Sequence, residues 1–527
     1  MFLARHSRLI ALTLLGGALF FGGLLRFGAA RVGDGVEEFW RQNDWEYYGI
    51  GVQLAEAGQF RQYPGQVPNA FRMPLYPAAI SLLRRIRPGI AALRSTQALL
   101  DWMAIAAVYA IAAALGGGPC GGLAAALYAL SDLPVGQVPL PQIESFFGVL
   151  IILFVYTWIQ RVHYDGSKGS LLLPAALLGL TLFCRSTLVL LPFFLVWIIP
   201  IKDWKARGRA AAVLVLSSYL FLSPWVARNA AVFGRFIPFE NGAASINLWG
   251  ASIGMLDNPM VARMLGSPKH KDFLERMQQA PDLDRSRLYL RETLKNIARR
   301  PMPFFLNFFR RLPILWREQW ILLLLALPFL LRRPLPQGSG IIILMLAYFN
   351  IHAFMGVTPR YARPVFGVSC VAAALGLRAL LTPASKSKRP LVWPRLAATA
   401  GGALLAVIYL VAAGQLLAEA WRWRGRFTYL PTEYLDSPRH YNVIKSGNAA
   451  GVEFEFQGRM RDAESIFTAV LRREPLFGES LLGRAMVRDF QSKRNGAAQD
   501  YRTLLFNLEF PQRRPLRPDM ESRLRQF

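Results

Sequence analysis

Long apolar runs separated by short polar segments dominate the first 420 or so residues of the chain. Several of these runs approach or exceed the roughly 17–25 residues that a helix needs to cross a bilayer. The predicted spans lie at about residues 9–28, 95–115, 120–133, 145–160, 169–184, 187–201, 210–226, 319–331, 339–355, 364–381 and 396–418. The pattern therefore predicts an all-α polytopic membrane protein with about eleven transmembrane helices.

The first apolar run, from about Leu9 to Gly28, follows Arg5 and Arg8. A cleaved signal peptide has a similar charge pattern, and FGAA would serve as its small-residue cleavage site. The run is longer than a usual signal core, however, and further apolar runs follow it. We therefore predict an uncleaved first helix.

Two further apolar segments are predicted to lie in the membrane interface. PLYPAAISLL, from Pro74, has only about a dozen apolar residues before Arg84 and Arg85, which is too few for a span. PMPFFLNFFRRLPILW, from Pro301, has an amphipathic pattern, with Arg310 and Arg311 among apolar residues. Arginines of such helices fit the level of the lipid headgroups.

Basic residues give the orientation of the spans. The net charge is +28, from 61 Lys and Arg against 33 Asp and Glu. The most basic short loops, KDWKARGR from Lys202 and SKSKRPLVWPR from Ser385, are four predicted spans apart and share a side with Arg5 and Arg8. The positive-inside rule places that side in the cytoplasm, although the basic residues from Arg84 to Arg94 run against this orientation. No nucleic-acid-binding module is visible, so the charge does not indicate a nucleic-acid partner.

The last hundred or so residues differ from the rest of the chain. VEFEFQGRMRDAESIFTAVLRREP and RNGAAQDYRTLLFNLEFP share a small residue, an aromatic residue and a leucine at fixed offsets. These units resemble tetratricopeptide helix pairs of about 34 residues; a generic helical bundle is the alternative. We predict a transmembrane domain at 1–420 with outer loops at 31–94 and 227–318, and an extracytoplasmic helical tail at 421–527. Tandem helix pairs suit the binding of a protein partner.

Polar residues collect at the outer face of this topology. They are the acids Asp44 and Glu144, the tyrosines Tyr48 and Tyr76, and the arginines Arg72, Arg185, Arg228, Arg360 and Arg363. Charges at the ends of spans are often lipid anchors and nothing more. Guanidinium groups also bind phosphate through paired hydrogen bonds, and a carboxylate can take a proton from an incoming hydroxyl. The set therefore suits a reaction in which a lipid-borne phosphate departs.

Arg185 is the least easily explained as an anchor. It interrupts LTLFCRSTLVLLPF, where only about one residue separates two long apolar segments. The pattern predicts an extremely tight outer turn with Arg185 at its tip.

Cysteine and histidine do not indicate a metal site. The three cysteines, Cys120, Cys184 and Cys370, lie in or beside apolar segments and show no C-x-x-C spacing. The five histidines do not cluster either. We predict that the cysteines are small buried apolar residues.

Several motifs resemble those of GT-C glycosyltransferases, in particular the branch that contains protein O-mannosyltransferases and lipid A aminoarabinose transferases. The first is D-x-x-YY-x-x-x-x-x-LA-x-x-G-x-F, from Asp44, followed by R-x-PLYP. The turn at Glu144, L-x-R-S-T, PW-x-x-RN with V-F-G-x-F-x-P, and a late R-Y-x-R-P follow in family order across roughly residues 9–380.

The resemblance implies a GT-C fold and transfer of a sugar from a polyprenyl-phosphate carrier at the outer face of the membrane. It implies catalytic roles for Asp44 and Glu144, and contacts of Arg360 and Arg185 with the carrier phosphate. Many members have adjacent Asp and Glu, whereas this chain has Asp44-Trp45-Glu46, so Glu46 stays outside the predicted catalytic pair. Some relatives bind a divalent metal ion near these acids, which leaves a metal cofactor open here.

The predicted function is that of a polyprenyl-phosphate-sugar-dependent hexosyl- or pentosyltransferase of the cytoplasmic membrane, with its active site and tail on the periplasmic side. Its partners would be the lipid-linked donor, a lipid, glycan or protein acceptor, and membrane lipids. Two other classes stay open: a transporter or lipid flippase, whose charges mark a pathway near the midplane, and a non-catalytic envelope scaffold. The gathering of charges at one face and the retained acids favour the transferase.

Overall fold

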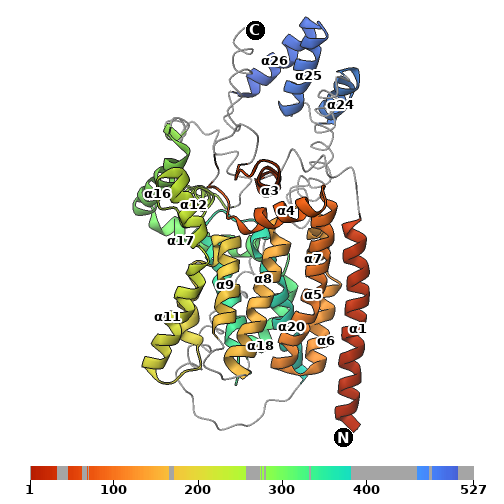
Figure 1. Cartoon of the computed structure of the whole chain (residues 1–527), viewed down its shortest axis with the longest axis vertical. Coiled ribbons are helices and arrows are strands. Elements are labelled where there is room, and N and C mark those ends of the chain that lie inside the picture. Colours follow the sequence, from red (N-terminus) through yellow and green to blue (C-terminus); the bar gives the residue numbers. More distant parts are fainter. Residues whose placement is uncertain are drawn as a thin grey trace. The chain divides into compact units, whose positions relative to one another are not determined.

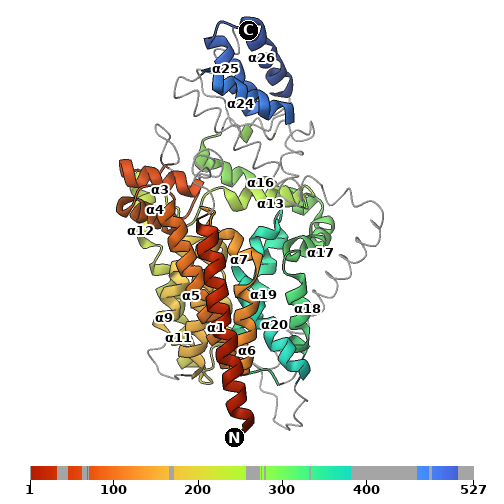
Figure 2. The same ribbon diagram turned by 90° about the vertical axis from the view of Figure 1, so that its right-hand side faces the viewer.

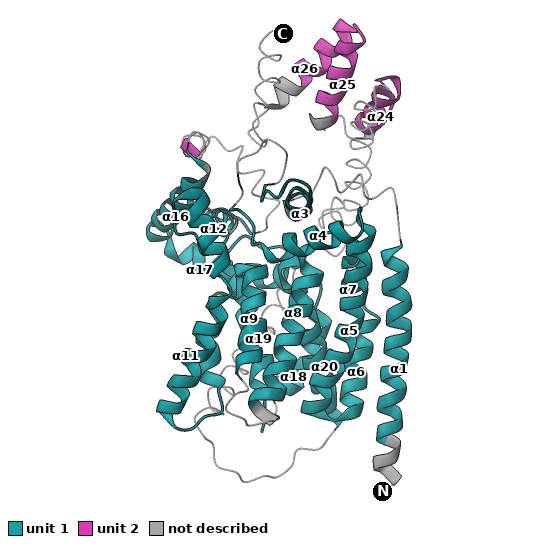
Figure 3. Cartoon of the chain, viewed as in Figure 1, with its two compact units in different colours: residues 1–32, 46–258, 281–418 teal, residues 33–45, 259–280, 419–527 magenta. Residues whose placement is uncertain are grey.

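A computed structural model describes the chain at residues 2–31, 46–61, 68, 70–164, 171–256, 273, 276–277, 280–331, 334–381, 460–473 and 478–508. These residues form helices and no β-strand, which confirms the predicted all-α class. The chain divides into two compact units (Figure 3). The membrane unit comprises Met1–Val32, Glu46–Asn258 and Pro281–Ala418, and the tail unit comprises Gly33–Trp45, Pro259–Ala280 and Glu419–Phe527.

The membrane unit is a bundle of helices with shorter helices across one end. Its α-helices are α1 Phe2–Ala30, α3 Glu46–Ala57, α4 Leu75–Ile86, α5 Ala91–Gly116, α6 Gly118–Ala129, α7 Asp132–Gln137, α8 Ile143–Trp158, α9 Leu172–Cys184, α10 Leu191–Leu195, α11 Trp204–Leu220, α12 Ser223–Phe233, α13 Ala243–Ser252, α16 Asp282–Arg299, α17 Pro301–Trp316, α18 Trp320–Leu331, α19 Gly340–Phe349 and α20 Phe366–Leu381. Short 3-10 segments are η2 Ser186–Leu188, η3 Val196–Ile198, η5 Asn350–Phe354 and η6 Pro359–Val365, and η1 Ile159–Tyr164 is a π-helical turn.

In Figures 1 and 2, α3, α4, α13 and α16 lie across one end of the bundle formed by α1, α5, α6, α8, α9, α11, α18 and α20. We call this the capped end.

The length and composition of the helices are those of a multi-pass membrane protein. Among the residues that the structure describes, four helices are long and apolar enough to cross a bilayer: Ser7–Ala30, Ala91–Gly116, Ile143–Val162 and Pro359–Leu381. Two more spans result if each of two bent pairs counts as one: Trp204–Leu220 with Ser223–Phe233, and Pro301–Trp316 with Trp320–Leu331. Shorter apolar helices occupy Leu172–Cys184, Ser186–Ile198 and Gly340–Phe354. The count of eleven is not confirmed, and the predicted span at 396–418 lies outside the described residues.

The two predicted interfacial segments are helices of the expected extent. α4 has 12 residues and ends in Arg84 and Arg85. α17 meets α18 at an angle of 108°, so α17 lies nearly perpendicular to the apolar helix that follows it. That bend is what a helix along the membrane surface needs before the chain turns into the bilayer. Their location in the interface stays a prediction.

Helix α1 packs closely on α5 and α6 and carries a buried charge that the sequence reading did not single out. A Cβ at Gly22 would stand 2.6 Å from Ile105 Cδ1, so glycine permits the close approach. One turn later, Arg26 is fully buried and its Nε donates to Asp101 Oδ2 at 2.5 Å. Arg26 also donates to the carbonyl of Ala129 at 2.8 Å. The pair fixes α1 on α5, because separating it would leave two charges in an apolar interior.

The described part of the tail is a three-helix cluster. Its helices are α24 Met460–Arg473, α25 Gly478–Phe490 and α26 Arg494–Leu508. Ala463 and Phe467 of α24 are buried against Val487 of α25, and Tyr501 of α26 is buried against Ala485. The predicted helical tail is thus present in these residues, and its tetratricopeptide character stays a prediction.

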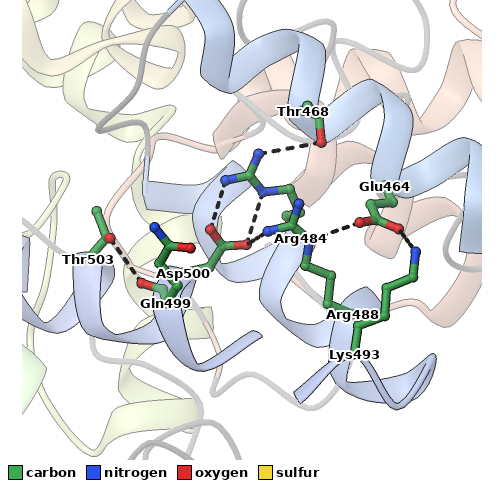
Figure 4. Close-up of polar contacts among 8 residues, drawn as sticks. All are labelled: Glu464, Thr468, Arg484, Arg488, Lys493, Gln499, Asp500 and Thr503. Atoms are coloured by element: carbon green, nitrogen blue, oxygen red, sulfur yellow. Dashed lines mark hydrogen bonds and ion pairs between the residues drawn. The ribbon is translucent and has the colours of Figure 1, made fainter. Parts of the chain in front are cut away.

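Ion pairs tie the tail helices together (Figure 4). Asp500 accepts hydrogen bonds from Arg484 Nε at 2.9 Å and Nη2 at 2.7 Å, and from Arg488 Nη1 at 2.9 Å. Glu464 accepts from Arg488 Nε at 2.8 Å and Lys493 Nζ at 2.6 Å. The acid of α26 and the acid of α24 therefore share Arg488 of α25.

Replacing Asp500 by asparagine is expected to destabilise the tail by about 3 kcal/mol, because two guanidinium groups lose their buried counter-charge. Limited proteolysis should cut the α24–α26 region faster, while fragments of the membrane unit stay as in wild type. Asp489→Asn, on the same helix cluster, is the matched control. Equal protease resistance of the two variants would contradict this role for Asp500.

Candidate active site

Glu144 and two arginines form a compact charged cluster at the capped end. Glu144 lies in the first turn of α8, where the sequence predicted that a span begins. Arg360 of η6 donates to it in a fork, from Nε to Oε1 at 2.7 Å and from Nη2 to Oε2 at 3.0 Å. Arg185 Nη1 lies 3.3 Å from Glu144 Oε1. Three predicted site residues, far apart in the sequence, therefore meet.

The acid of this cluster lies behind its arginines. The Glu144 side chain is 1% exposed, whereas that of Arg360 is 33% exposed and that of Arg185 is 18% exposed. A ligand that approaches the cluster therefore meets guanidinium groups and not the carboxylate. The geometry favours Glu144 as a residue that holds the arginines in place, and it leaves its predicted catalytic role untested.

The tight turn predicted at Arg185 is present. α9 ends at Cys184, Arg185 is extended, with φ −155° and ψ 133°, and η2 begins at Ser186. The Arg185 guanidinium stands 5.7 Å from the centre of the Tyr361 ring. Because Arg185 is the single extended residue between two helices, its side chain is not part of either helical face and reaches Glu144.

Tyr361 is a site residue that the sequence reading missed. Its hydroxyl accepts a hydrogen bond from Asn247 Nδ2 of α13 at 3.2 Å. Gly356 N also donates to the Asn247 carbonyl, at 3.1 Å. α13 therefore supports both the entry to η6 and the ring beside Arg185. The R-Y-x-R-P motif contains Tyr361, but only its arginines are obvious phosphate ligands, so the sequence predicts Arg360 and Arg363 as site residues and not Tyr361.

Glu240 is a second site residue that the sequence reading missed. It follows α12, and its Oε1 accepts a hydrogen bond from Ser186 Oγ at 2.8 Å. Ser186 directly follows Arg185, so Glu240 contacts the turn that carries the phosphate-binding candidate. No motif or spacing signals this contact, because only the fold brings residues 186 and 240 together.

The tyrosines predicted to bind substrate are held within the fold. The Tyr48 hydroxyl accepts from Arg84 Nη1 at 3.3 Å, and the Tyr76 hydroxyl donates to Gln97 Oε1 at 2.6 Å. Both side chains are buried. Burial raises the pKa of Tyr76 well above its usual value, and the nearby Glu144 charge raises it further, so the phenol stays neutral. Tyr48 therefore ties α3 to α4, and Tyr76 ties α4 to α5.

Arg72 lies between α3 and α4, close to aromatic rings. Its guanidinium stands 4.6 Å from the centre of the Phe71 ring and 5.3 Å from that of Tyr47. Burial raises the pKa of Tyr47 and the charge of Glu240 raises it further, while Arg185 lowers it. The charges of Glu240 and Arg185 therefore both act on Tyr47, and the Arg72 guanidinium lies over its ring.

Arg228 lies in the wall of a cavity of about 700 Å³. The cavity is lined by Leu54, Gly58, Gln59, Phe60, Arg61, Pro68, Pro74, Phe183, Pro224, Trp225, Arg228 and Val232. The guanidinium is 5.1 Å from the ring centres of Trp225 and Phe233 and 5.2 Å from that of Phe60. Mostly apolar walls with two arginines suit a ligand that carries both an apolar chain and an anionic group. Phe183 links this wall to the Arg185 turn, two residues further along the chain.

Arg363 belongs to a separate ion pair. Its Nε and Nη2 donate to Glu318, at 2.8 and 2.7 Å. It lies on η6 with Arg360, but its fork is directed at Glu318, which follows α17, and not at Glu144. The structure therefore separates two arginines that the sequence grouped together.

Asp44, the predicted catalytic base, lies outside the described residues. α3 begins at Glu46, two residues later, and its other end borders the cavity through Gly58 and Phe60. α3 itself packs on α4, whose Arg84 bonds to Glu56 at 2.7 Å.

No group of three or more His, Cys, Asp or Glu side chains that could hold a metal ion occurs among the described residues. Both Glu144 oxygens accept hydrogen bonds from arginines. Asp44 is not among the described residues. A metal cofactor therefore stays open.

Replacing Glu144 by glutamine is expected to weaken the binding of bare polyprenyl phosphate roughly tenfold, or about 1.4 kcal/mol, because the arginines lose the negative charge and one of the two acceptor oxygens that hold them. Affinity and turnover should be measured on the same preparation, with the surface variant Glu292→Gln as control. Lost turnover at unchanged affinity would instead support a catalytic acid.

Solved structures with a similar arrangement of helices include two kinds of enzyme. The crystal structure of the Archaeoglobus fulgidus oligosaccharyltransferase with zinc and sulfate has a TM-score of 0.43 at 16% identity, over 76% of this chain and 52% of that one. The same enzyme, AglB, with an inhibitory peptide and dolichol-phosphate gives 0.38 at 16%, over 77% and 55%. ArnT from Cupriavidus metallidurans with undecaprenyl phosphate gives 0.33 at 15%, over 70% and 77%. Both enzymes are GT-C glycosyltransferases.

The superfamily of these structures is the one that the sequence motifs resemble. The chain spans only about half the length of the oligosaccharyltransferases. No protein-family model matches the chain, and no curated protein does. Since the TM-scores are below 0.5, the function proposed next rests on the residues of the chain itself.

Proposed function

We propose that this protein transfers a sugar from a polyprenyl-phosphate carrier to an acceptor at the outer face of the cytoplasmic membrane. The observation that carries the proposal is the pair Arg185 and Arg360, held by the covered carboxylate of Glu144 with their own side chains partly exposed. Guanidinium groups fixed in advance bind a phosphate without reorganising, which is how charge on a leaving group is best stabilised. The apolar cavity beside Arg228 supports binding of a lipid chain nearby.

The proposed reaction is an inverting displacement. Asp44 takes the proton of the acceptor hydroxyl, and the acceptor oxygen forms a bond to the anomeric carbon of the sugar. The bond from that carbon to the phosphate oxygen breaks, and the polyprenyl phosphate leaves with the electron pair. Arg360 and Arg185 stabilise the charge on the phosphate oxygens. The sugar would be a hexose or a pentose, and a phosphate monoester is a good enough leaving group without a metal.

The alternatives differ in what they require of the charges. A transporter needs ionisable groups along a pathway near the middle of the bilayer. Arg26 and Asp101 do lie within candidate spans, but they are paired and covered. The partly exposed arginines of the Glu144 cluster, Arg185 and Arg360, lie at the capped end, which favours a surface reaction over transport. A scaffold would require none of these pairs.

We place the capped end and the tail on the periplasmic side. Single cysteines at Asn43 and Ser446 should react with an impermeant thiol reagent added to intact spheroplasts, and one at Lys386 should react only after lysis. The background is a variant in which Cys120, Cys184 and Cys370 are serine; all three are buried. Labelling only at position 386 in intact spheroplasts would show that the proposed site faces the cytoplasm.

The activity is tested with the full chain in proteoliposomes that contain radiolabelled polyprenyl-phosphate sugars and an envelope extract as acceptor. We expect time-dependent formation of bare polyprenyl phosphate and labelled acceptor for at least one sugar. Movement of an intact lipid-linked sugar across the bilayer, without its cleavage, would identify a flippase instead.

A further inference from the structure

Glu240 is the acid at this site that neither the motifs nor the proposed mechanism uses. It lies between α12 and α13 and is half-buried, as is Ser186, whose hydroxyl donates to it at 2.8 Å. Among the described residues, this hydroxyl is the hydrogen-bond donor found for the Glu240 carboxylate. A charged acceptor at a half-buried position has room for further donors.

Two backbone features hold Glu240 against the segment that carries Arg72. Asn241 N donates to the Ala70 carbonyl at 2.8 Å. Gly242 has φ +126°, and a Cβ there would stand 2.5 Å from the Phe71 ring, so glycine is required by both conformation and space. On its other side, Glu240 meets the Arg185–Ser186 turn. It is therefore fixed between two segments that carry predicted phosphate ligands.

The accessible acid beside Arg185 is Glu240 and not Glu144. Glu144 is 1% exposed and is covered by both arginines, whereas Glu240 is half-buried with a neutral hydroxyl as its neighbour. A carboxylate repels phosphate but accepts strong hydrogen bonds from hydroxyl groups. A ligand that carries phosphate at one end and hydroxyl groups at the other would place its phosphate on the arginines and its hydroxyl groups on Glu240.

We infer that Glu240, assisted by Ser186, is a substrate-binding residue that accepts hydrogen bonds from hydroxyl groups of the transferred sugar. The inference rests on the proposed function, and it assigns the sugar end of the donor to the 186–240 contact. Hydrogen bonds to a charged acceptor that are lost on substitution reduce affinity by roughly 10–100-fold. Bare carrier should be bound independently of Glu240.

The test compares ligands that differ only in the sugar. The full chain in nanodiscs is titrated with polyprenyl phosphate and with polyprenyl-phosphate hexoses and pentoses of the same chain length. Wild type should bind at least one sugar-bearing form more tightly than bare carrier. Glu240→Gln should lose roughly 10–100-fold in affinity for that form and keep its affinity for bare carrier. Ser186→Ala should show a smaller loss of the same kind, and Asp284→Asn, which removes an exposed ion pair with Arg235, should show none.

Parallel loss of both ligands in Glu240→Gln would indicate a structural role and overturn the inference, as would unchanged affinity for both. If wild type binds bare carrier and sugar-bearing forms equally, the inferred sugar-binding role of Glu240 is wrong, while the proposed carrier-binding site is retained. If wild type binds no polyprenyl phosphate at all, the proposed function itself fails.

Discussion

Replacing Arg360 by lysine is expected to lower sugar transfer by roughly 10²–10³-fold, the usual cost of removing one preorganised donor to a developing charge. Lysine keeps the positive charge but has no planar fork. Lysine therefore cannot bind both oxygens of Glu144, which Arg360 reaches at 2.7 and 3.0 Å, and a phosphate at the same time. Initial rates of transfer at saturating donor would measure the effect.

Arg235→Lys is the matched control, because Arg235 pairs with Asp284 at the surface, where lysine should serve equally well. Its transfer rate should stay near that of wild type. A rate for Arg360→Lys equal to that of this control would exclude a phosphate-binding role for Arg360.

Replacing Asp44 by asparagine should lower turnover by roughly 10²–10⁴-fold, since the side chain keeps its size but can no longer accept a proton. Binding of the carrier should change little, because the proposed phosphate contacts lie elsewhere. Initial rates and carrier affinity should both be determined. The separation between lost turnover and kept affinity is what distinguishes a base from a binding residue.

Glu46→Gln is the closest comparison, as it neutralises an acid two residues away on the same segment. We expect a small effect, because Glu46 begins α3 and departs from the adjacent-acid pattern of the resembled family. A larger loss of turnover in Glu46→Gln than in Asp44→Asn would assign the role of the base to Glu46 and not to Asp44.

The sequence was most informative where a charge broke an apolar pattern. Arg185 could be placed on a one-residue turn, and Glu144 at the start of a span, because apolar runs on both sides define the ends of the helices. The structure places both residues there, with the side chains in contact. Such local signals do not depend on knowing the fold.

Pairings between distant segments could not be predicted in this way. Arg363 was grouped with Arg360 because the two are three residues apart, yet its partner is Glu318, and Arg360 reaches Glu144 across 216 positions. Arg26 lies within the first predicted span, and no local signal pairs it with Asp101 of the next one, on which it is fully buried. The identity of a partner depends on packing between helices, which hydropathy does not encode.

The most direct measurement is a structure of the full chain in nanodiscs, determined by electron cryomicroscopy with polyprenyl phosphate. The proposed function predicts density for the phosphate within hydrogen-bond reach of Arg360 and Arg185, with the prenyl chain leading away through an apolar path. Glu144 should keep its fork with Arg360. Phosphate density at a site distant from both arginines, with their contacts to Glu144 unchanged, would contradict the central claim.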